Sequence, residues 1–390
     1  MTTNGVSSRP GRGLLLPATL IVLAIVLAAA NIRWPLEDFV EYWAAGRLSA
    51  AGANPYDPAA VLEAQRHIGW TEPAPVMMYN PPWTLALAMP MGAVEFRLGR
   101  SIWLPLQLFL AMWCASRLWI LYGGAPARIT RAWFLALLWS PTLLALRFGQ
   151  LSPVILLGLV GFLWCVVHRR DFAAGAFLTL TAVKPQLVAL VWVPFILWVY
   201  ADRKWKVLAG AATCLVGATL AAMSTNPRVF AQYFDLMASA PPMLTFESPN
   251  IATILRVLSG TRRTWPQYVP TALGAVAVVW LWVRRRNAWD WRRYLPGLVI
   301  ISCLLTSYGG WAFDLVVLLV PIVSLAAILS RASRTSLAVA GGVTFLAVSA
   351  LAFGMHAARV PQAGFVWMTP VVAVTWWPLR RAVRNVPCAD

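Results

Sequence analysis

Few residues of this 390-residue chain can do acid–base or ionic chemistry, because only 12% are charged and 60% are hydrophobic. Asp38 is the first candidate. It follows the apolar run 14–30 by eight residues, and Tyr42 lies one helical turn further on, on the same helix face. An acid so close to an apolar segment is partly desolvated, which raises its pKa towards that of a usable general base. The alternative is that Asp38 caps the start of a helix.

Lys184 is the second candidate, because it separates two short apolar runs, 172–184 and 187–200, and is followed by Pro185. A lysine in such a place usually faces a cavity or an anionic partner. Two half-helices broken at Lys-Pro therefore predict a phosphate-binding site. The alternative is that Lys184 extends to the membrane interface. Asp314, three residues into a later apolar run, is the other acid that we expect to be buried.

Polar and aromatic residues in the same segments are candidates to bind a substrate. Arginines can contact an anion, and tyrosine or tryptophan can pack on a sugar ring, although aromatic residues also serve as interface anchors. The candidate substrate-binding residues are Tyr42, Asn54, Tyr56, Asp57, Tyr79, Asn80, Arg147, Gln150, Lys184, Gln186, Asn250, Arg256, Tyr308, Trp311 and Asp314.

The chain lacks the sequence motifs of several other enzyme classes. No Walker loop, GxGxxG, GxSxG or HExxH sequence occurs, so nucleotide hydrolysis and zinc-protease chemistry have no support. The five cysteines show no CxxC or Cys/His spacing that would indicate a zinc site or a disulfide framework. We expect no cofactor and no required metal, although Glu37, Glu41 and Asp57 leave a metal near Asp38 open.

The elements that must position these residues are membrane-spanning helices, each of which takes about 20 apolar residues. The sequence predicts an all-α polytopic membrane protein, a single integral domain over 1–390 with about twelve transmembrane helices. A thirteenth transmembrane helix is possible if the short run 82–94 also crosses the membrane. The predicted spans are 14–30, 101–122, 131–147, 152–167, 172–184, 187–200, 207–223, 270–283, 294–307, 311–330, 336–354 and 365–379.

The charge pattern predicts the orientation of these spans. The net charge of +18 does not indicate a nucleic-acid partner, because the basic residues cluster between apolar runs, as in cytoplasmic loops of membrane proteins. With twelve crossings and both termini cytoplasmic, these clusters all lie inside, in an inner (plasma) membrane. Two long loops, 31–100 and 224–269, then lie outside, and 82–94 is a re-entrant or short helix. Long loops are usually functional, so we expect an extracytoplasmic active site. The run 14–30 is expected to be an anchor rather than a cleaved signal peptide.

One series of residues resembles a known family. Asp38, Tyr42, the segment 52–57 (GANPYD), Tyr79-Asn80-Pro81-Pro82, Gly149-Gln150 and Lys184-Pro185 are together similar to glycosyltransferase family 87. These are GT-C-fold membrane enzymes that use polyprenyl-phosphate sugars, typified by polyprenol-phosphate-mannose-dependent α-mannosyltransferases. The resemblance extends from about residue 14 to residue 330. Where many members carry a Ser-Pro-x-x-Trp-x-His-Tyr-like stretch, this chain has SYGGWAFD at 307–314, without the histidine.

The resemblance implies an inverting transfer of a hexose, mannose by analogy, from a polyprenyl-phosphate donor to a lipid or glycan acceptor. Asp38 would be the catalytic base and Lys184 would lie near the donor phosphate, with Arg147 and Arg256 as further phosphate candidates. The competing hypothesis is a secondary transporter whose site is formed by Asp38, Lys184 and Asp314. A membrane scaffold without catalytic activity is a third.

Overall fold

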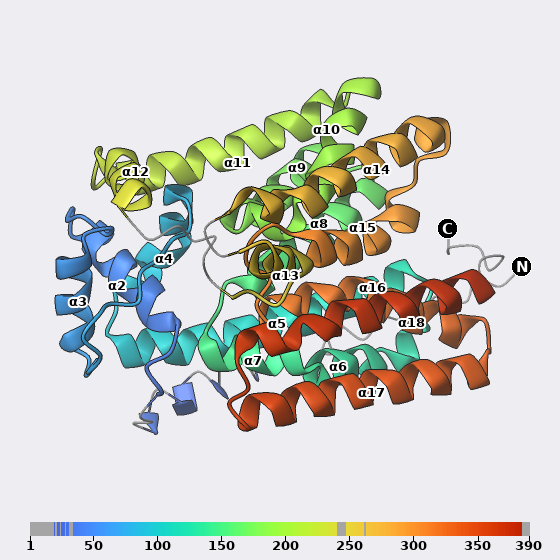
Figure 1. The fold of residues 1–390 in the computed structure, drawn as a ribbon, viewed down its shortest axis with the longest axis horizontal. Coiled ribbons are helices and arrows are strands. Elements are labelled where there is room, and N and C mark those ends of the chain that lie inside the picture. Colours follow the sequence, from blue (N-terminus) through green and yellow to red (C-terminus); the bar gives the residue numbers. More distant parts are fainter. Residues whose placement is uncertain are drawn as a thin grey trace, which may run out of the picture.

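The computed structural model describes residues 19, 22–23, 25–27, 29–30, 34–239, 247–260 and 263–383. Most of the predicted span 14–30 lies outside the described residues, as do parts of the predicted loops 31–100 and 224–269. Within the described ranges every regular element is a helix, as the sequence predicts for an all-α protein (Figure 1).

The α-helices alternate with short 3₁₀ turns. The α-helices are α2 (Phe39–Ala50), α3 (Pro58–Arg66), α4 (Leu85–Gly92), α5 (Phe96–Leu121), α6 (Thr130–Leu138), α7 (Ser140–Phe148), α8 (Ser152–Val167), α9 (Asp171–Thr179), α10 (Ala189–Ala201), α11 (Trp205–Met223), α12 (Val229–Ser239), α13 (Ile251–Leu258), α14 (Val269–Arg285), α15 (Trp291–Leu305), α16 (Leu319–Arg331), α17 (Thr335–Ala357) and α18 (Met368–Ala382). The 3₁₀ turns are η1 (Pro82–Thr84), η2 (Pro126–Arg128), η3 (Leu180–Val183), η4 (Pro185–Val188), η6 (Trp265–Tyr268), η7 (Arg286–Ala288), η8 (Asp314–Leu318) and η9 (Gln362–Trp367).

Several of these helices are long and apolar enough to cross a membrane. Among the described residues five qualify alone: Phe96–Leu121, Trp205–Met223, Trp265–Ala288, Asp314–Arg331 and Thr335–Ala357. Two bent pairs, Pro126–Leu138 with Ser140–Phe148 and Asp171–Val183 with Pro185–Ala201, raise the number of candidate spans to seven. The chain is therefore a multi-pass membrane protein. The predicted number of twelve spans stays a prediction.

Prolines explain both bends. The residue before a proline is disfavoured in the α region, so a helix usually stops there. Lys184 directly precedes Pro185. Trp139 stands two residues before Pro141, which has no N–H to continue the hydrogen bonds of the preceding helix. Both residues adopt non-helical angles, with ψ of 71° for Lys184 and 111° for Trp139. The chain turns by 61° at the first break and by 120° at the second. The second bend brings Lys184 to the tip of a broken span, as the sequence predicts.

The helices of the first loop gather at one end of the bundle. Figure 1 shows α2, α3 and α4 at the end opposite the turn between α16 and α17. Helices α2 and α4 pack so closely that glycine is required at their crossing. A Cβ atom at Gly46 would lie 2.1 Å from the backbone oxygen of Ala88, and one at Gly92 would lie 2.1 Å from the backbone nitrogen of Arg47. This contact holds α2, the helix that begins directly after Asp38.

We expect Gly46→Ala to destabilise the protein although alanine is the better helix former. The added methyl group would force the two backbones apart, and overpacking of this kind costs about 1–3 kcal/mol. Gly354→Ala on α17 is the control, because a Cβ there meets no atom within 4 Å. Thermal unfolding of the purified variants measures the effect. Equal unfolding midpoints for the two variants would contradict this account of the crossing.

Candidate active site

Gln150 connects four separate parts of the chain in one hydrogen-bonded network. Its side-chain amide nitrogen donates to Oδ2 of Asp38 at the start of α2. Its amide oxygen accepts a hydrogen bond from the Tyr42 hydroxyl at 2.9 Å and another from Nζ of Lys184 at 2.8 Å. Lys184 Nζ also donates to Oδ1 of Asp314 at 2.9 Å. Residues that are more than 100 positions apart in the sequence thus meet at one point.

The chemistry of its partners dictates how the Gln150 amide is oriented. A lysine ammonium group can only donate hydrogen bonds, so the amide atom that faces Lys184 must be the oxygen. The amide nitrogen then faces Asp38 and holds one oxygen of its carboxylate. No hydrogen bond to the other oxygen, Oδ1, comes from the described residues.

A tight turn places Gln150 in this position. Gly149 ends α7 in the left-handed conformation, with φ of 72°, and a Cβ there would lie 2.6 Å from the Cβ of Phe39. Only glycine fits both the backbone angle and the contact. The turn therefore depends on glycine, which explains why Gly and Gln occur together at 149–150.

Three polar residues of α5 hold the carbonyl groups of this turn. Arg100 donates to the carbonyls of residues 146 and 147 at 2.6 Å, Trp103 to that of Gly149 at 2.8 Å, and Gln107 to that of Gln150. Sequence reasoning missed all three. Their signal was the spacing 100, 103 and 107, which places polar groups on one face of an otherwise apolar helix.

Lys184 and Asp314 form a buried ion pair. The exposed fractions of their side chains are 12% and 1%. Asp314 also accepts hydrogen bonds from the Ser152 hydroxyl and, at 3.2 Å, from the backbone nitrogen of Trp311. Sequence analysis grouped Lys184 with Asp314 only in the transporter alternative, and the structure places the two side chains in contact. Because Lys184 turns inward to Asp314, it does not extend to the membrane interface.

Asp38 does not act as a helix cap. It stands at the N-cap position of α2, but its side chain makes no capping hydrogen bond. Burial raises the pKa of Asp38 from its usual 3.8 to about 6, while the hydrogen bond from Gln150 and the charge of Lys184 act in the opposite direction. A carboxylate with this pKa is mostly ionised at neutral pH and basic enough to accept a proton.

Glu41 is a second acid of the site that sequence analysis mentioned only as a metal candidate. Burial raises its pKa from 4.5 to about 8, and the negative charge of Asp38 adds to that rise. Burial raises the pKa values of Tyr79 and Tyr308, and the negative charge of nearby Glu41 adds to both shifts. At neutral pH the proton resides on Glu41 and the negative charge on Asp38. Within the described ranges no three His, Cys, Asp or Glu side chains form a group that could hold a metal ion.

Several predicted substrate-binding residues instead bind the backbone. Asn54 accepts from the backbone nitrogen of Tyr56 at 3.0 Å, and Asp57 caps α3. Asn250 caps α13 and donates to the carbonyl of Gly309 at 2.8 Å. These side chains shape the loops beside the site.

Asn80 connects the first loop to the broken span. Its side chain donates to the carbonyl of Val183 at 2.8 Å, and its own carbonyl accepts from the Tyr56 hydroxyl. The backbone carbonyl of Gln186, on the other side of the break, accepts from Thr306 at 3.0 Å. The break around Lys184 is thereby fixed from two sides.

The remaining candidates have different surroundings. Arg147 is exposed and pairs with Glu37 at 3.4 Å, outside the Gln150 network. Arg256 is buried on α13. Trp311 reaches the network through its backbone nitrogen, and Tyr308 is partly buried beside it.

The raised pKa of Asp38 predicts the pH dependence of any reaction that uses it as a base. Below pH 6 Asp38 is protonated, so kcat/KM should fall about tenfold for each pH unit. Above pH 8 ionised Glu41 adds a second negative charge, which should weaken the binding of an anionic substrate. In Glu41→Gln, kcat/KM should still fall below pH 6 but should no longer fall above pH 8. An acidic limb near pH 4 would instead indicate an ordinary exposed carboxylate.

Comparisons with known proteins identify the family of this chain. Residues 78–307 match Glycosyltransferase family 87. The chain is 32% identical over 251 residues to an α-(1→3)-arabinofuranosyltransferase of Corynebacterium glutamicum. The match covers 62% of this chain and spans 59% of the length of that relative. No solved structure shows a significant match. Because the family match covers more than half of the 390 residues, the chain belongs to glycosyltransferase family 87.

Proposed function

We propose that the protein transfers a sugar from a polyprenyl-phosphate donor to a hydroxyl group of a lipid or glycan acceptor, with inversion at the anomeric carbon. The observation that carries this proposal is the Gln150 network, in which a basic carboxylate, Asp38, and a buried ammonium group, Lys184, are held on the same amide. The carboxylate can accept the proton that the acceptor hydroxyl loses. The ammonium group can stabilise the negative charge of the phosphate that leaves.

In the proposed reaction, Oδ1 of Asp38 accepts the proton of the acceptor hydroxyl as its oxygen attacks the anomeric carbon. The bond between this carbon and the phosphate oxygen breaks, and polyprenyl phosphate leaves with the bonding electrons. Lys184 donates two of its three N–H groups to Gln150 and Asp314, and we assign the third to a phosphate oxygen. Its charge stabilises the negative charge that develops there. Asp38 then releases its proton to water.

We propose a pentofuranosyl group as the sugar, in place of the mannose that the family resemblance implies. The support is the name of the C. glutamicum relative, an arabinofuranosyltransferase. Tyr79 and Tyr308, which lie near Glu41, are suited to pack on the sugar ring.

We also propose that the reaction needs no divalent cation and takes place on the extracytoplasmic side of the plasma membrane, with both termini cytoplasmic. A polyprenyl phosphate paired with Lys184 is a competent leaving group without a metal. The arginine-rich loops support the orientation through the positive-inside rule.

The experiment supplies purified protein in lipid nanodiscs with a polyprenyl-phospho-arabinofuranose or a polyprenyl-phospho-mannose and a glycan acceptor. We expect release of polyprenyl phosphate from the arabinofuranosyl donor, unchanged by EDTA, and a product of inverted anomeric configuration by NMR. Turnover with the mannosyl donor alone would contradict the sugar assignment, and loss of activity in EDTA would contradict the metal-free mechanism. Uptake of solute into vesicles without consumption of lipid-linked sugar would favour the transporter alternative.

A further inference from the structure

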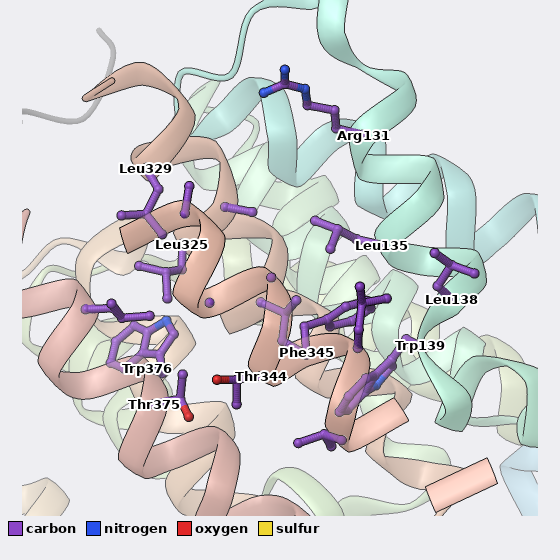
Figure 2. Close-up of a pocket in the computed structure, with 18 of the residues that line it drawn as sticks. Arg131, Leu135, Leu138, Trp139, Leu325, Leu329, Thr344, Phe345, Thr375 and Trp376 are labelled. Atoms are coloured by element: carbon purple, nitrogen blue, oxygen red, sulfur yellow. The ribbon is translucent and has the colours of Figure 1, made fainter. Parts of the chain in front are cut away.

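A cavity of about 380 Å³ lies between α6, α16, α17 and α18, away from the Gln150 network. This volume falls within the roughly 300–1,000 Å³ of small-molecule sites. Its lining is almost entirely apolar, with Leu135, Leu325, Phe345 and Trp376 on different walls (Figure 2). Phe134, which also lines it, is 62% exposed, so the cavity opens on the outer surface of the bundle. In a membrane-spanning bundle that surface is in contact with hydrocarbon.

Arginines surround one end of this cavity. Helices α6, α16, α17 and α18 each begin or end there with basic residues, and Arg131 is one of the lining residues, at the edge of the set in Figure 2. Arg131 donates to Ser330 at 3.4 Å, which brings the start of α6 next to the end of α16. The arginines at this end are Arg128, Arg131, Arg331, Arg334, Arg380 and Arg381. The segments 126–138 and 319–383, which carry these helices, contain no acidic residue.

The arginine end lies far from the catalytic network. The candidate span Asp314–Arg331 begins at the network and ends at the arginines. Its 18 residues extend about 26 Å at 1.5 Å per residue, close to the hydrocarbon thickness of a bilayer. A phosphate held by Arg131 therefore cannot be the one that reacts beside Lys184.

We propose that the cavity holds one acyl chain of an anionic phospholipid, with the lipid phosphate against Arg131. The apolar lining matches a hydrocarbon chain, and the arginines at this end match a negatively charged headgroup. The four helices that the lipid would join include α16, which connects the arginine end to Asp314. The bound lipid would thus stabilise the helix that positions one partner of the buried ion pair.

The chain offers a matched pair of variants to test this site. Gly342 lines the cavity, and a Cβ there meets no atom within 4 Å, so we expect the side chain of Gly342→Leu to extend into the cavity. Gly354 lies on the same helix with equally open space but does not line the cavity, so Gly354→Leu is the control. Native mass spectrometry of protein from nanodiscs of equal phosphatidylglycerol and phosphatidylcholine gives the retained lipid.

We expect the unmodified protein and Gly354→Leu to retain one phosphatidylglycerol, at least about tenfold in preference to phosphatidylcholine, and Gly342→Leu to retain neither. Arg131→Gln should lose the preference for phosphatidylglycerol, and Arg131→Lys should keep it. This pair tests whether the headgroup binds at Arg131 even if Gly342→Leu does not fold. Equal retention by the two leucine variants, or no preference in the unmodified protein, would overturn the proposal. So would displacement of phosphatidylglycerol by stoichiometric polyprenyl phosphate. Lipid retention does not require turnover, so this result is independent of the proposed reaction.

Discussion

Replacing Asp38 with asparagine is expected to lower the kcat of sugar transfer at least about 100-fold, and as much as about 10,000-fold, the range that general bases contribute. Asparagine has nearly the shape of aspartate and still offers an oxygen to the amide nitrogen of Gln150, so the network around it should survive. It has no basic oxygen that could take the acceptor proton. The expected result is a folded protein that binds its donor and does not turn it over.

Asp57→Asn is the matched control for this variant. Asp57 belongs to the same loop, but its side chain caps α3. Asparagine caps a helix about as well as aspartate, so this substitution should leave both stability and kcat unchanged. Turnover of donor with release of polyprenyl phosphate measures kcat, and thermal unfolding measures folding. Activity retained by Asp38→Asn, or lost equally in both variants, would show that Asp38 is not the base.

Glu41→Gln separates the two acids of the site. Glu41 carries a proton at neutral pH, because its pKa is raised to about 8, and glutamine keeps a neutral hydrogen-bonding group in its place. We therefore expect a kcat close to that of the unmodified protein at pH 7. A larger loss in Glu41→Gln than in Asp38→Asn would assign the base to Glu41 instead.

The sequence indicates which residues take part in the site but not how they meet. Asp38, Gln150, Lys184 and Asp314 each occupy an unusual position in an apolar chain, and that is enough to select them. Their contacts depend on the 120° bend at Lys184 and on the crossing angles of helices far apart in the chain, which no local pattern specifies. The Lys184–Asp314 pair, 130 residues apart, is the clearest case.

For the polar residues of the loops, the sequence suggests a role in substrate binding that the structure does not support. Asn54, Asp57 and Asn250 look like ligands of a substrate, because they stand in a loop beside aromatic residues. Asn and Asp, however, also satisfy backbone N–H groups at turns and helix starts, and these three do so. The sequence does not distinguish the two uses, since both favour a short polar side chain at a turn or a helix start.

Lys184→Met is expected to have the second largest effect, on stability as well as activity. The substitution leaves Asp314, which is 1% exposed, without its ionic partner. Breaking a buried ion pair in this way costs about 3–5 kcal/mol. We expect a clearly lower thermal unfolding midpoint in detergent. Transfer should be lost as well, because the phosphate loses the ammonium group that stabilises its developing charge.

The double variant Lys184→Met with Asp314→Asn separates these two effects. Asparagine removes the buried charge, so the double variant should recover most of the lost unfolding midpoint. Its transfer rate should stay as low as in Lys184→Met, since the ammonium group is still missing. If the double variant recovered activity together with stability, Lys184 would serve only to neutralise Asp314, and the phosphate would have to bind elsewhere. If neither recovered, the cost would come from the loss of the hydrogen bond between Lys184 and Gln150, which also orients the amide that holds Asp38.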